Sequence, residues 1–226
     1  SNNKIYRFLP RRNDAVNDTW ICDHGRMSYK KNSTGRLTAP RADGREASYT
    51  DAVKRAGELV RATLDAKGKI VGVASPFASN ADLAAFRDLL AALGAGPARF
   101  SVPRGESDAI LIEAEKAPNA AGCVALGMVE SNEQLGRADL ALVLGHTLTA
   151  EVFGEVRNIV LIDTHESALS ARATVALPAR TFLEKSGAFT NSRGLVQPFS
   201  AVVEPTFEAW SESDALAQIA AAAGIP

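Results

Sequence analysis

Residues 140–177 of the chain read LALVLGHTLTAEVFGEVRNIVLIDTHESALSARATVAL. Short apolar runs alternate in this stretch with segments of helical pattern. The apolar runs are 140–145, 158–163 and 174–177, and the helical segments are 149–153 and 166–171. Apolar runs of this length, bounded by turn signals, are typical of buried parallel strands. Strands that alternate with helices predict a mainly parallel sheet with helices on both faces.

The same alternation extends to both sides of this stretch. The predicted elements are a helix over 49–66 with Ser48 as its N-cap, a strand over 70–74, a helix that Ser79 or Asn80 caps and Gly94 ends, a strand over 109–112 and a helix over 213–223. The predicted fold class is therefore α/β, with a Rossmann-like, mainly parallel sheet.

The N-terminal segment lacks this pattern. Residues 1–45 are rich in charge, Asn and Gly, and only Ile5–Leu9 alternates like a strand, closed by Pro10. We therefore divide the chain into an irregular N-terminal segment, 1–47, and an α/β body, 48–226.

Composition and charge exclude several classes of protein. The 226 residues predict one or two domains, and 26 acidic against 25 basic residues argue against a nucleic-acid-binding protein with a basic face. No apolar run approaches the ~18 residues of a membrane-spanning helix. The two cysteines, Cys22 and Cys123, exclude a disulfide scaffold and indicate a reducing compartment. Because the first residues include neither Met nor an apolar signal segment, we expect the chain to begin inside a longer protein.

Familiar catalytic motifs are absent. The chain has no G-x-G-x-x-G after a strand, no phosphate-binding loop and no G-x-S-x-G elbow. His146 and residues 163–166 follow predicted strands, at the edge where open α/β sheets bind ligands. They are site candidates, but a capping or solvated role is favoured for both. His24 and His165 show no zinc-ligand spacing with His146 or with either cysteine.

Cys22 and a later glycine-bearing stretch stand out. Cys22 lies among polar residues, with Gly25 to permit a tight turn and Arg26 to supply positive charge. An iron–sulfur cluster needs four ligands, normally thiolates, so one cysteine cannot hold it. With three more cysteines upstream of residue 1, Cys22 would be the fourth. In the later stretch, 188–197 predicts a hairpin whose turn is 191–194.

Four segments together resemble one family. They are Trp20-Ile21-Cys22-Asp23-His24-Gly25-Arg26, Arg36-Leu37-Thr38-Ala39-Pro40, Pro118-Asn119-Ala120-Ala121-Gly122 with Leu126-Gly127, and the stretch from Leu177-Pro178-Ala179 to Val196-Gln197. Their motifs and order resemble those of molybdopterin oxidoreductases and are most similar to the G subunit of bacterial NADH-quinone oxidoreductase (complex I). In this family, three cysteines spaced Cys-x2-Cys-x3-Cys precede a fourth, and Cys22 resembles that fourth ligand.

The resemblance implies a role in electron transfer. It implies a shortened domain of a G-type subunit that supports electron transfer from NADH through iron–sulfur clusters toward quinone, with this fragment itself not catalytic. It implies [4Fe-4S] and [2Fe-2S] centres in the full-length parent, with Arg26 near the cluster that Cys22 would ligate. No cofactor is expected in this fragment, because three cluster ligands are missing and molybdopterin domains are several times longer.

The resemblance also implies partners and a location. The expected partners are the other subunits of an NADH dehydrogenase-type complex, in a peripheral arm on the cytoplasmic side of the membrane. Three alternatives stay open: a molybdenum or tungsten bis-pterin oxidoreductase of the formate dehydrogenase type, a hydrogenase diaphorase module, and an α/β assembly module without a redox role.

In every case the polar, loop-like residues are candidates for contact with partners, since function concentrates in loops. The candidates for an interface or a vestigial pocket are Glu184, Lys185, Thr190, Asn191 and Arg193, together with exposed residues of 1–45. Plain solvated loops are the alternative interpretation.

Overall fold

The sheet at the centre of the fold is built mainly from parallel strands. Its strands are β1 (Arg41–Ala42), β2 (Arg45–Glu46), β3 (Ile70–Val73), β4 (Arg99–Phe100), β5 (Val129–Glu130), β6 (Ala138–Leu144), β7 (Val156–Asp163) and β8 (Val175–Pro178). In this computed structural model, which describes residues 3–108, 110, 112–145 and 147–226, their order is β2-β1-β8-β7-β6-β3-β4-β5. Neighbours from β8 to β5 pair in parallel, while β1 pairs antiparallel with β8 and β2.

The order of the strands places a switch point between β3 and β6. The chain runs outward from β3 through β4 to β5, returns to pair β6 with β3, and then runs outward through β7 to β8. This is the doubly wound order in which ligands bind outside the carboxyl ends of the two central strands. A ligand-binding site is therefore expected first at the carboxyl edge of β3 and β6.

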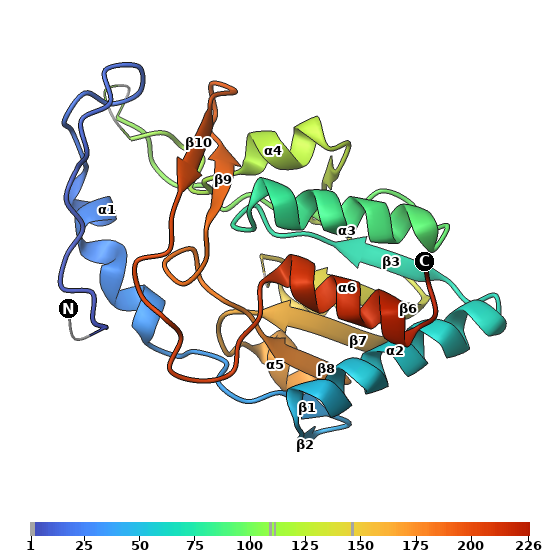
Figure 1. The fold of residues 1–226 in the computed structure, drawn as a ribbon. Helices are drawn as coiled ribbons and strands as arrows, with labels where there is room; N and C mark the ends of the chain where they lie inside the picture. Colours follow the sequence, from blue (N-terminus) through green and yellow to red (C-terminus); the bar gives the residue numbers. More distant parts are fainter. Residues whose placement is uncertain (1–2, 109, 111, 146) are drawn as a thin grey trace.

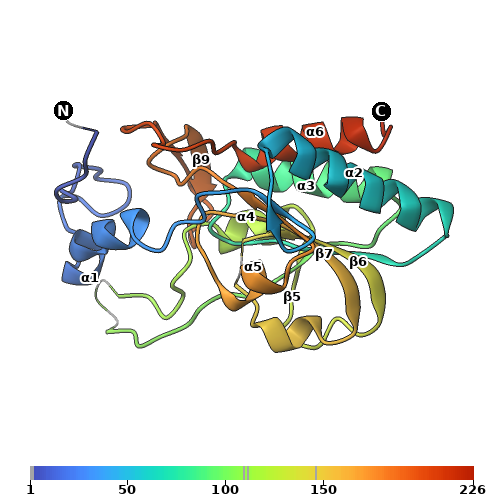
Figure 2. The ribbon, with the colours of Figure 1, turned by 90° about the horizontal axis from the view of Figure 1, so that it is seen from below.

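Helices cover the two faces of the sheet unequally. The α-helices are α1 (Asp23–Met27), α2 (Tyr49–Asp65), α3 (Asn80–Ala92), α4 (Ala120–Ala125), α5 (Ala168–Arg172) and α6 (Glu212–Ala222), and the 3-10 helices are η1 (Ser28–Ser33) and η2 (Ala150–Phe153). The long helices α2, α3 and α6 lie side by side on one face, and the short α5 lies on the other (Figures 1 and 2). Each face has its own apolar core, and the core under the long helices is the larger.

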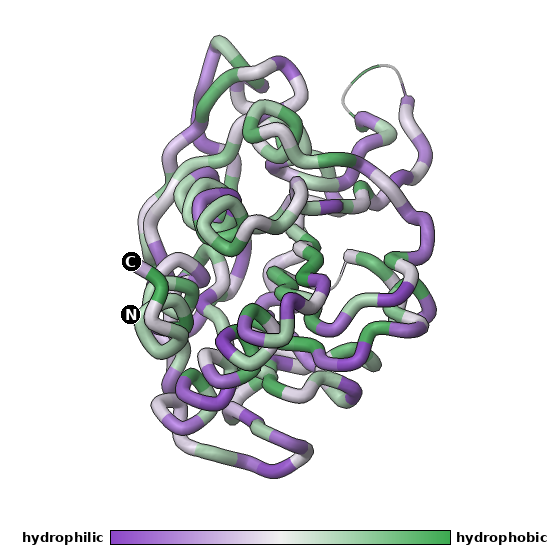
Figure 3. Tube along the Cα trace, turned by 90° about the vertical axis from the view of Figure 1, so that its right-hand side faces the viewer, coloured by the Kyte–Doolittle hydropathy of each residue, from purple (hydrophilic) through white to green (hydrophobic). Residues whose placement is uncertain are grey.

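Helix α6 approaches α2 very closely. A Cβ on Gly57 of α2 would lie 2.5 Å from the Cβ of Ala222 in α6, so only glycine fits at this crossing. Hydrophobic colours gather in the strands at the middle of the molecule, while hydrophilic colours mark many of the outer turns (Figure 3). Burial of the small aliphatic residues on both sides of the sheet therefore supplies the main driving force for folding.

Local side chains start the long helices where the sequence predicts. Ser48 accepts a hydrogen bond from Asp51 N at the start of α2, and Ser211 accepts one from Asp214 N at the start of α6. Ser79 and Asp82 form a reciprocal capping box at the start of α3. Lys67, with φ of 52°, turns the chain after α2.

Most predicted elements are confirmed, and two strands are wrong. The structure has helices at 49–65, 80–92 and 212–222, and strands at 70–73, 138–144, 156–163 and 175–178. Ile5–Leu9 forms no strand, because no other strand pairs with it among the described residues. In the predicted strand 109–112, Ile110 and Ile112 lie exposed in a loop, while residues 109 and 111 lie outside the described residues.

The strands β4 and β5 have two residues each, too few for a sequence pattern to predict them.

The hairpin is confirmed: β9 (Gly187–Thr190) pairs antiparallel with β10 (Val196–Phe199). Among the helices of the described residues, none is long and apolar enough to cross a membrane.

Candidate functional site

Cys22 lies at the start of α1 in the N-terminal segment. Its Sγ accepts a hydrogen bond from Gly25 N at 3.3 Å, and the residue is half-buried. Hydrogen bonds to sulfur are one of the means by which proteins tune thiolate ligands of iron–sulfur clusters. Arg26 follows in the same turn and donates its backbone N–H to Cys22 O, while its guanidinium makes no ion pair among the described residues.

The described residues do not complete a cluster site. No group of three or more His, Cys, Asp or Glu side chains in them could hold a metal ion. The second cysteine, Cys123, is fully buried in α4, and burial raises the pKa of its thiol to about 12. Cys123 therefore stays protonated and packs as a small apolar side chain, so the chain offers one accessible thiol and not a ligand set.

Arg36 fixes the N-terminal segment to the body. Its guanidinium binds Glu184 with two hydrogen bonds of 2.9 Å, and both side chains are only 8% exposed. Arg36 Nε donates to Thr164 O at 2.9 Å, and Nη2 donates to Ala179 O at 3.1 Å. The guanidinium also lies 5.0 Å from the ring centroid of Phe207. These contacts join the end of the N-terminal segment to the carboxyl edge of β7 and β8.

Glu184 is built to stay ionised. Burial by itself would raise the pKa of this carboxyl group, but hydrogen bonds from Arg36 and Thr181 lower the pKa below its ordinary value. Thr181 contributes both its backbone N–H, at 2.8 Å, and its hydroxyl, at 3.0 Å. The carboxylate is therefore saturated with donors from its own chain.

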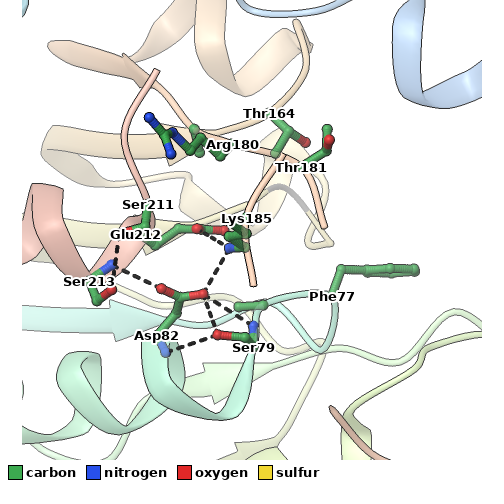
Figure 4. Close-up of polar contacts among 12 residues, drawn as sticks. Phe77, Ser79, Asp82, Thr164, Arg180, Thr181, Lys185, Ser211, Glu212 and Ser213 are labelled. Carbon is green, nitrogen blue, oxygen red and sulfur yellow. Dashed lines mark hydrogen bonds and ion pairs between the residues drawn. The ribbon is translucent and has the colours of Figure 1, made fainter. Parts of the chain in front are cut away.

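Lys185 lies between two buried carboxylates from different helices (Figure 4). Its Nζ donates to Asp82 Oδ2 of α3 at 2.8 Å and to Glu212 Oε2 of α6. Asp82 also accepts from Ser79 Oγ at 2.5 Å and from Ser213 N at 3.0 Å. Lys185 thus holds the first turns of α3 and α6 together, next to the hairpin.

The pKa values of Asp82, Glu212 and Lys185 are shifted in different directions. Burial would raise the pKa of Asp82, but Lys185 and Ser79 lower it below the ordinary value. Burial is the main reason that the pKa of Glu212 rises to about 7. Burial would lower the pKa of Lys185, yet the two carboxylates raise it. The ammonium ion therefore persists across the physiological pH range, while Glu212 gains a proton near neutral pH.

Glu212 makes stability depend on pH. The pKa of Glu212 is 4.5 in the unfolded chain and about 7 in the folded state. Between pH 4.5 and pH 7 the folded state therefore keeps a proton on Glu212 that the unfolded chain has released. The contribution of Glu212 to stability is then greatest below pH 4.5, falls as the pH rises through this window and is constant above it, with a total change on the order of 3 kcal/mol. Glu212→Gln is expected to remove this decline when unfolding by urea is measured from pH 5 to pH 8.

The other two buried carboxyl groups change the stability only outside this pH window. Asp82 and Glu184 have lowered pKa values in the folded state, so their stabilisation is lost only as the pH falls below their ordinary range. An unchanged slope in the Glu212→Gln variant between pH 5 and pH 8 would show that Glu212 is already ionised throughout.

The hairpin is fastened to the body through an asparagine. Asn119 Oδ1 accepts from Thr190 N at 2.7 Å, and its Nδ2 donates to Ala78 O at 2.8 Å. Asn80 Nδ2 donates to Thr190 Oγ1 at 3.0 Å. A Cβ on Gly122 would lie 2.2 Å from Asn119 Oδ1, so the glycine leaves room for this amide. Asn119 and Gly122 of the third sequence motif therefore serve Thr190 of the fourth.

The structure separates the five residues predicted as an interface or pocket. Glu184 and Lys185 are buried and paired within the chain. Thr190 is half-buried and bound to Asn80 and Asn119, while Asn191 Oδ1 accepts from Arg193 N and Leu195 N in the hairpin turn. Of the side chains, that of Arg193 is the exposed one without a described partner. A role of these residues in an interface stays a prediction.

The loop at 163–166 binds the N-terminal segment and does not cap α5. Ser167, in a capping box with Ser170, begins α5 instead of Asp163 or Thr164. His165 lies between Thr164 Oγ1, at 2.7 Å from Nδ1, and Lys31 O, at 2.8 Å from Nε2. His146 lies outside the described residues.

Sequence reasoning missed three residues of the buried ion pairs. They are Arg36, Asp82 and Glu212, whose partners lie far away in the chain. No local pattern indicates these pairings. Asp82 alone carries a signal, because its place three residues after Ser79 is recognisable as that of a capping partner.

The carboxyl edge at the switch point is closely packed. A Cβ on Gly145, after β6, would lie 2.8 Å from the Cβ of Ser75, after β3. Ser75 is buried and its Oγ accepts from Phe77 N. The buried cations Lys185 and Arg36 are paired within the chain and so are not directed at a ligand.

Comparisons with known proteins agree with the motifs. Residues 128–222 match the family model of molybdopterin oxidoreductases, and residues 1–30 match that of the NADH-ubiquinone oxidoreductase NDSU1/NuoG-like 4Fe-4S domain. Over 95 residues, the chain is 32% identical to the G subunit of NADH-quinone oxidoreductase from Rickettsia conorii, a match that covers 40% of this chain and 14% of that protein.

Among solved structures, the chain is similar to one from the formyltransferase/hydrolase complex of Methylorubrum extorquens with methylofuran. The TM-score is 0.49 and the identity 13%, over 80% of this chain and 97% of that chain. The family resemblance of the motifs is confirmed by the two family models, which find a molybdopterin oxidoreductase domain over residues 128–222 and a NuoG-like 4Fe-4S domain over residues 1–30.

Proposed function

We propose that the chain is a domain of a G-type subunit of NADH-quinone oxidoreductase that supports electron transfer from NADH through iron–sulfur clusters toward quinone. The observation that carries the proposal is Cys22, a half-buried thiol with an N–H···S hydrogen bond inside the segment that matches the 4Fe-4S domain. In this proposal Cys22 is the fourth ligand of a [4Fe-4S] cluster whose other ligands lie elsewhere in the parent protein, and Arg26 lies beside the cluster.

The α/β body has a positioning role in this proposal and no catalytic role. Its buried charges are neutralised within the chain, by Glu184 for Arg36 and by Asp82 and Glu212 for Lys185. A catalytic site needs polar groups directed at a substrate, whereas these groups hold structural elements together. Arg36, within segment 1–47, keeps the cluster segment at a fixed place on the body through its hydrogen bonds to Thr164, Glu184 and Ala179.

The proposal extends to partners and location. The other subunits of an NADH dehydrogenase-type complex are the partners, and the domain belongs to a peripheral arm on the cytoplasmic side of the membrane. The match to the Rickettsia conorii protein supports this assignment, and the near-neutral composition of the chain accords with protein partners.

Replacement of each cysteine in turn with alanine, in the full-length protein, tests the proposal. Cys22→Ala is expected to remove the iron of one [4Fe-4S] cluster and its electron paramagnetic resonance signal, because a cluster with three protein ligands is easily lost. Cys123→Ala is the matched control, since this thiol is buried in the core, and it is expected to keep both the iron and the signal.

Two results would contradict the proposal. One is a Cys22→Ala protein with unchanged iron content and an unchanged signal. The other is stoichiometric molybdenum or tungsten with pterin in the full-length protein, which would favour an oxidoreductase of the formate dehydrogenase type.

A further inference from the structure

A groove of about 430 Å³ lies between the β9–β10 hairpin and residues 113–118, and neither Cys22 nor any residue of the buried ion pairs lines it. Three phenylalanines line its floor. Phe189 and Phe199 stack at 4.6 Å between ring centroids, and Phe182 meets Phe199 edge-on at 6.4 Å. All three are only half-buried, whereas the phenylalanines of the two cores are fully buried. The groove thus exposes aromatic surface to solvent.

Two carboxylates stand at the rim of this groove. The side chains of Glu113 and Glu115 make no hydrogen bond or ion pair among the described residues. The neighbouring cations are already engaged. Arg104 attracts Glu115 but binds both carboxylate oxygens of Glu130, and Lys116 Nζ donates to backbone oxygens. The groove therefore combines an aromatic floor with negative charge that no described cation pairs directly.

We propose that this groove docks a partner protein through an extended segment that carries arginine next to apolar side chains. A guanidinium group is the cation that suits this site best, because it stacks on aromatic faces and pairs with carboxylates through two hydrogen bonds. The same chain already uses this arrangement internally, where Arg36 lies over the ring of Phe207 and binds both oxygens of Glu184. In the groove the aromatic and acidic halves are present and the arginine is supplied by the partner.

The apolar surface continues beyond the groove, which favours a protein segment over a small cation. Leu195 is 42% exposed and Val196 is 58% exposed on the same hairpin. Among the described strands, β10 is paired on one side only, with β9, so its other edge has no strand partner. A small cation would fill the groove but leave this strip uncovered, whereas a peptide of several residues covers both.

Binding of labelled peptides to the protein tests the inference independently of any cluster. The probe is a fluorescein-labelled peptide of sequence Ala-Leu-Arg-Val-Arg-Leu-Ala, compared with the same peptide carrying citrulline for arginine. Citrulline keeps the shape of arginine but has no charge. Anisotropy is expected to show saturable binding of the arginine peptide, at least tenfold weaker binding of the citrulline peptide, and weaker binding at higher salt.

Variants of the protein locate the site. Glu113→Gln with Glu115→Gln is expected to weaken binding at least tenfold, and Ser192→Trp, which fills the groove and keeps its charges, is expected to do the same. Glu133→Gln with Glu155→Gln is the matched control, since both are exposed acids away from the groove, and it is expected to bind unchanged. Neither carboxylate at the rim has a hydrogen-bonded partner in the described residues, so thermal unfolding of the first variant is expected to match that of the parent chain.

Three outcomes overturn the proposal. They are equal binding of the citrulline peptide, no saturable binding at millimolar peptide, and displacement of the peptide by free arginine amide with the same affinity, which would make the groove a small-cation site. Because these measurements need no iron, their failure leaves the Cys22 experiment unaffected, and the reverse also holds.

Discussion

Replacement of Lys185 with methionine is expected to lower the free energy of unfolding by about 3–5 kcal/mol, the loss typical when one partner of a buried ion pair is removed. Methionine has nearly the length of lysine, so packing is kept while the ammonium is lost. Asp82 and Glu212 are then left as two buried carboxyl groups without a cation, and they face each other across the start of α3 and α6. In thermal unfolding, a loss of this size lowers the melting temperature by roughly 6–20 °C.

The loss is expected to depend on pH. Because Lys185 lowers the pKa of Glu212, its removal raises this pKa further. At pH 5 Glu212 is protonated with or without Lys185, whereas at pH 8 burial without the cation disfavours the ionised carboxylate, so the destabilisation is smaller at pH 5. Lys185→Met with Glu212→Gln is expected to recover part of the stability at pH 8. Lys54→Met, on the exposed side of α2, is the control that should change little. A Lys185→Met protein as stable as the parent at pH 8 would falsify the assigned role of this ammonium.

Replacement of Arg36 with alanine is expected to cost about 3–5 kcal/mol and to release the N-terminal segment. The change leaves Glu184 buried without its cation and removes the hydrogen bonds to Thr164 O and Ala179 O. Arg36→Lys is expected to recover little of the loss, since an ammonium cannot bind both oxygens of Glu184 and both backbone oxygens in this geometry.

Two measurements separate the role of Arg36 from a general loss of stability. Limited proteolysis is expected to cut the N-terminal segment of the variant at denaturant concentrations where the α/β body is still folded. Arg45→Ala, at an exposed arginine without an ion pair in the described residues, should behave like the parent chain. Simultaneous cleavage of segment and body would mean that Arg36 stabilises the whole fold and is no specific anchor.

The sequence predicts the α/β body well because its strands are buried on both faces. In β6 and β7 nearly every residue is buried, and each strand is followed by a segment with recognisable helix caps or turns. The errors arise where an apolar pattern has no neighbour in space. Ile5–Leu9 alternates like a strand but meets no strand among the described residues, and Ile110 is 84% exposed although it lies in an apolar run. Pairing over long sequence separation is not encoded in a local pattern.

The buried charges are the part of the candidate site that local patterns do not reveal. Lysine and glutamate are rarely buried, so the sequence places Glu184 and Lys185 at the surface of a polar loop. Their partners come from two helices and a loop, and Arg36 of this loop is 148 residues from Glu184 in the chain. The family motifs nevertheless pair with one another in space, Arg36 with Glu184 and Asn119 with Thr190. The second, third and fourth motifs are thus explained by architecture without reference to any cofactor.

The packing of α6 against α2 has a consequence for synthesis of the chain on the ribosome. At about 5–20 residues per second, α2 leaves the ribosome on the order of ten seconds before α6 exists to cover it. During this interval the apolar face around Gly57 has no covering helix. Arg36 likewise has no ion-pair partner until Glu184 has been synthesised. The body therefore completes its core late, and the segment that carries Cys22 is synthesised and accessible before the fold to which it is anchored has closed.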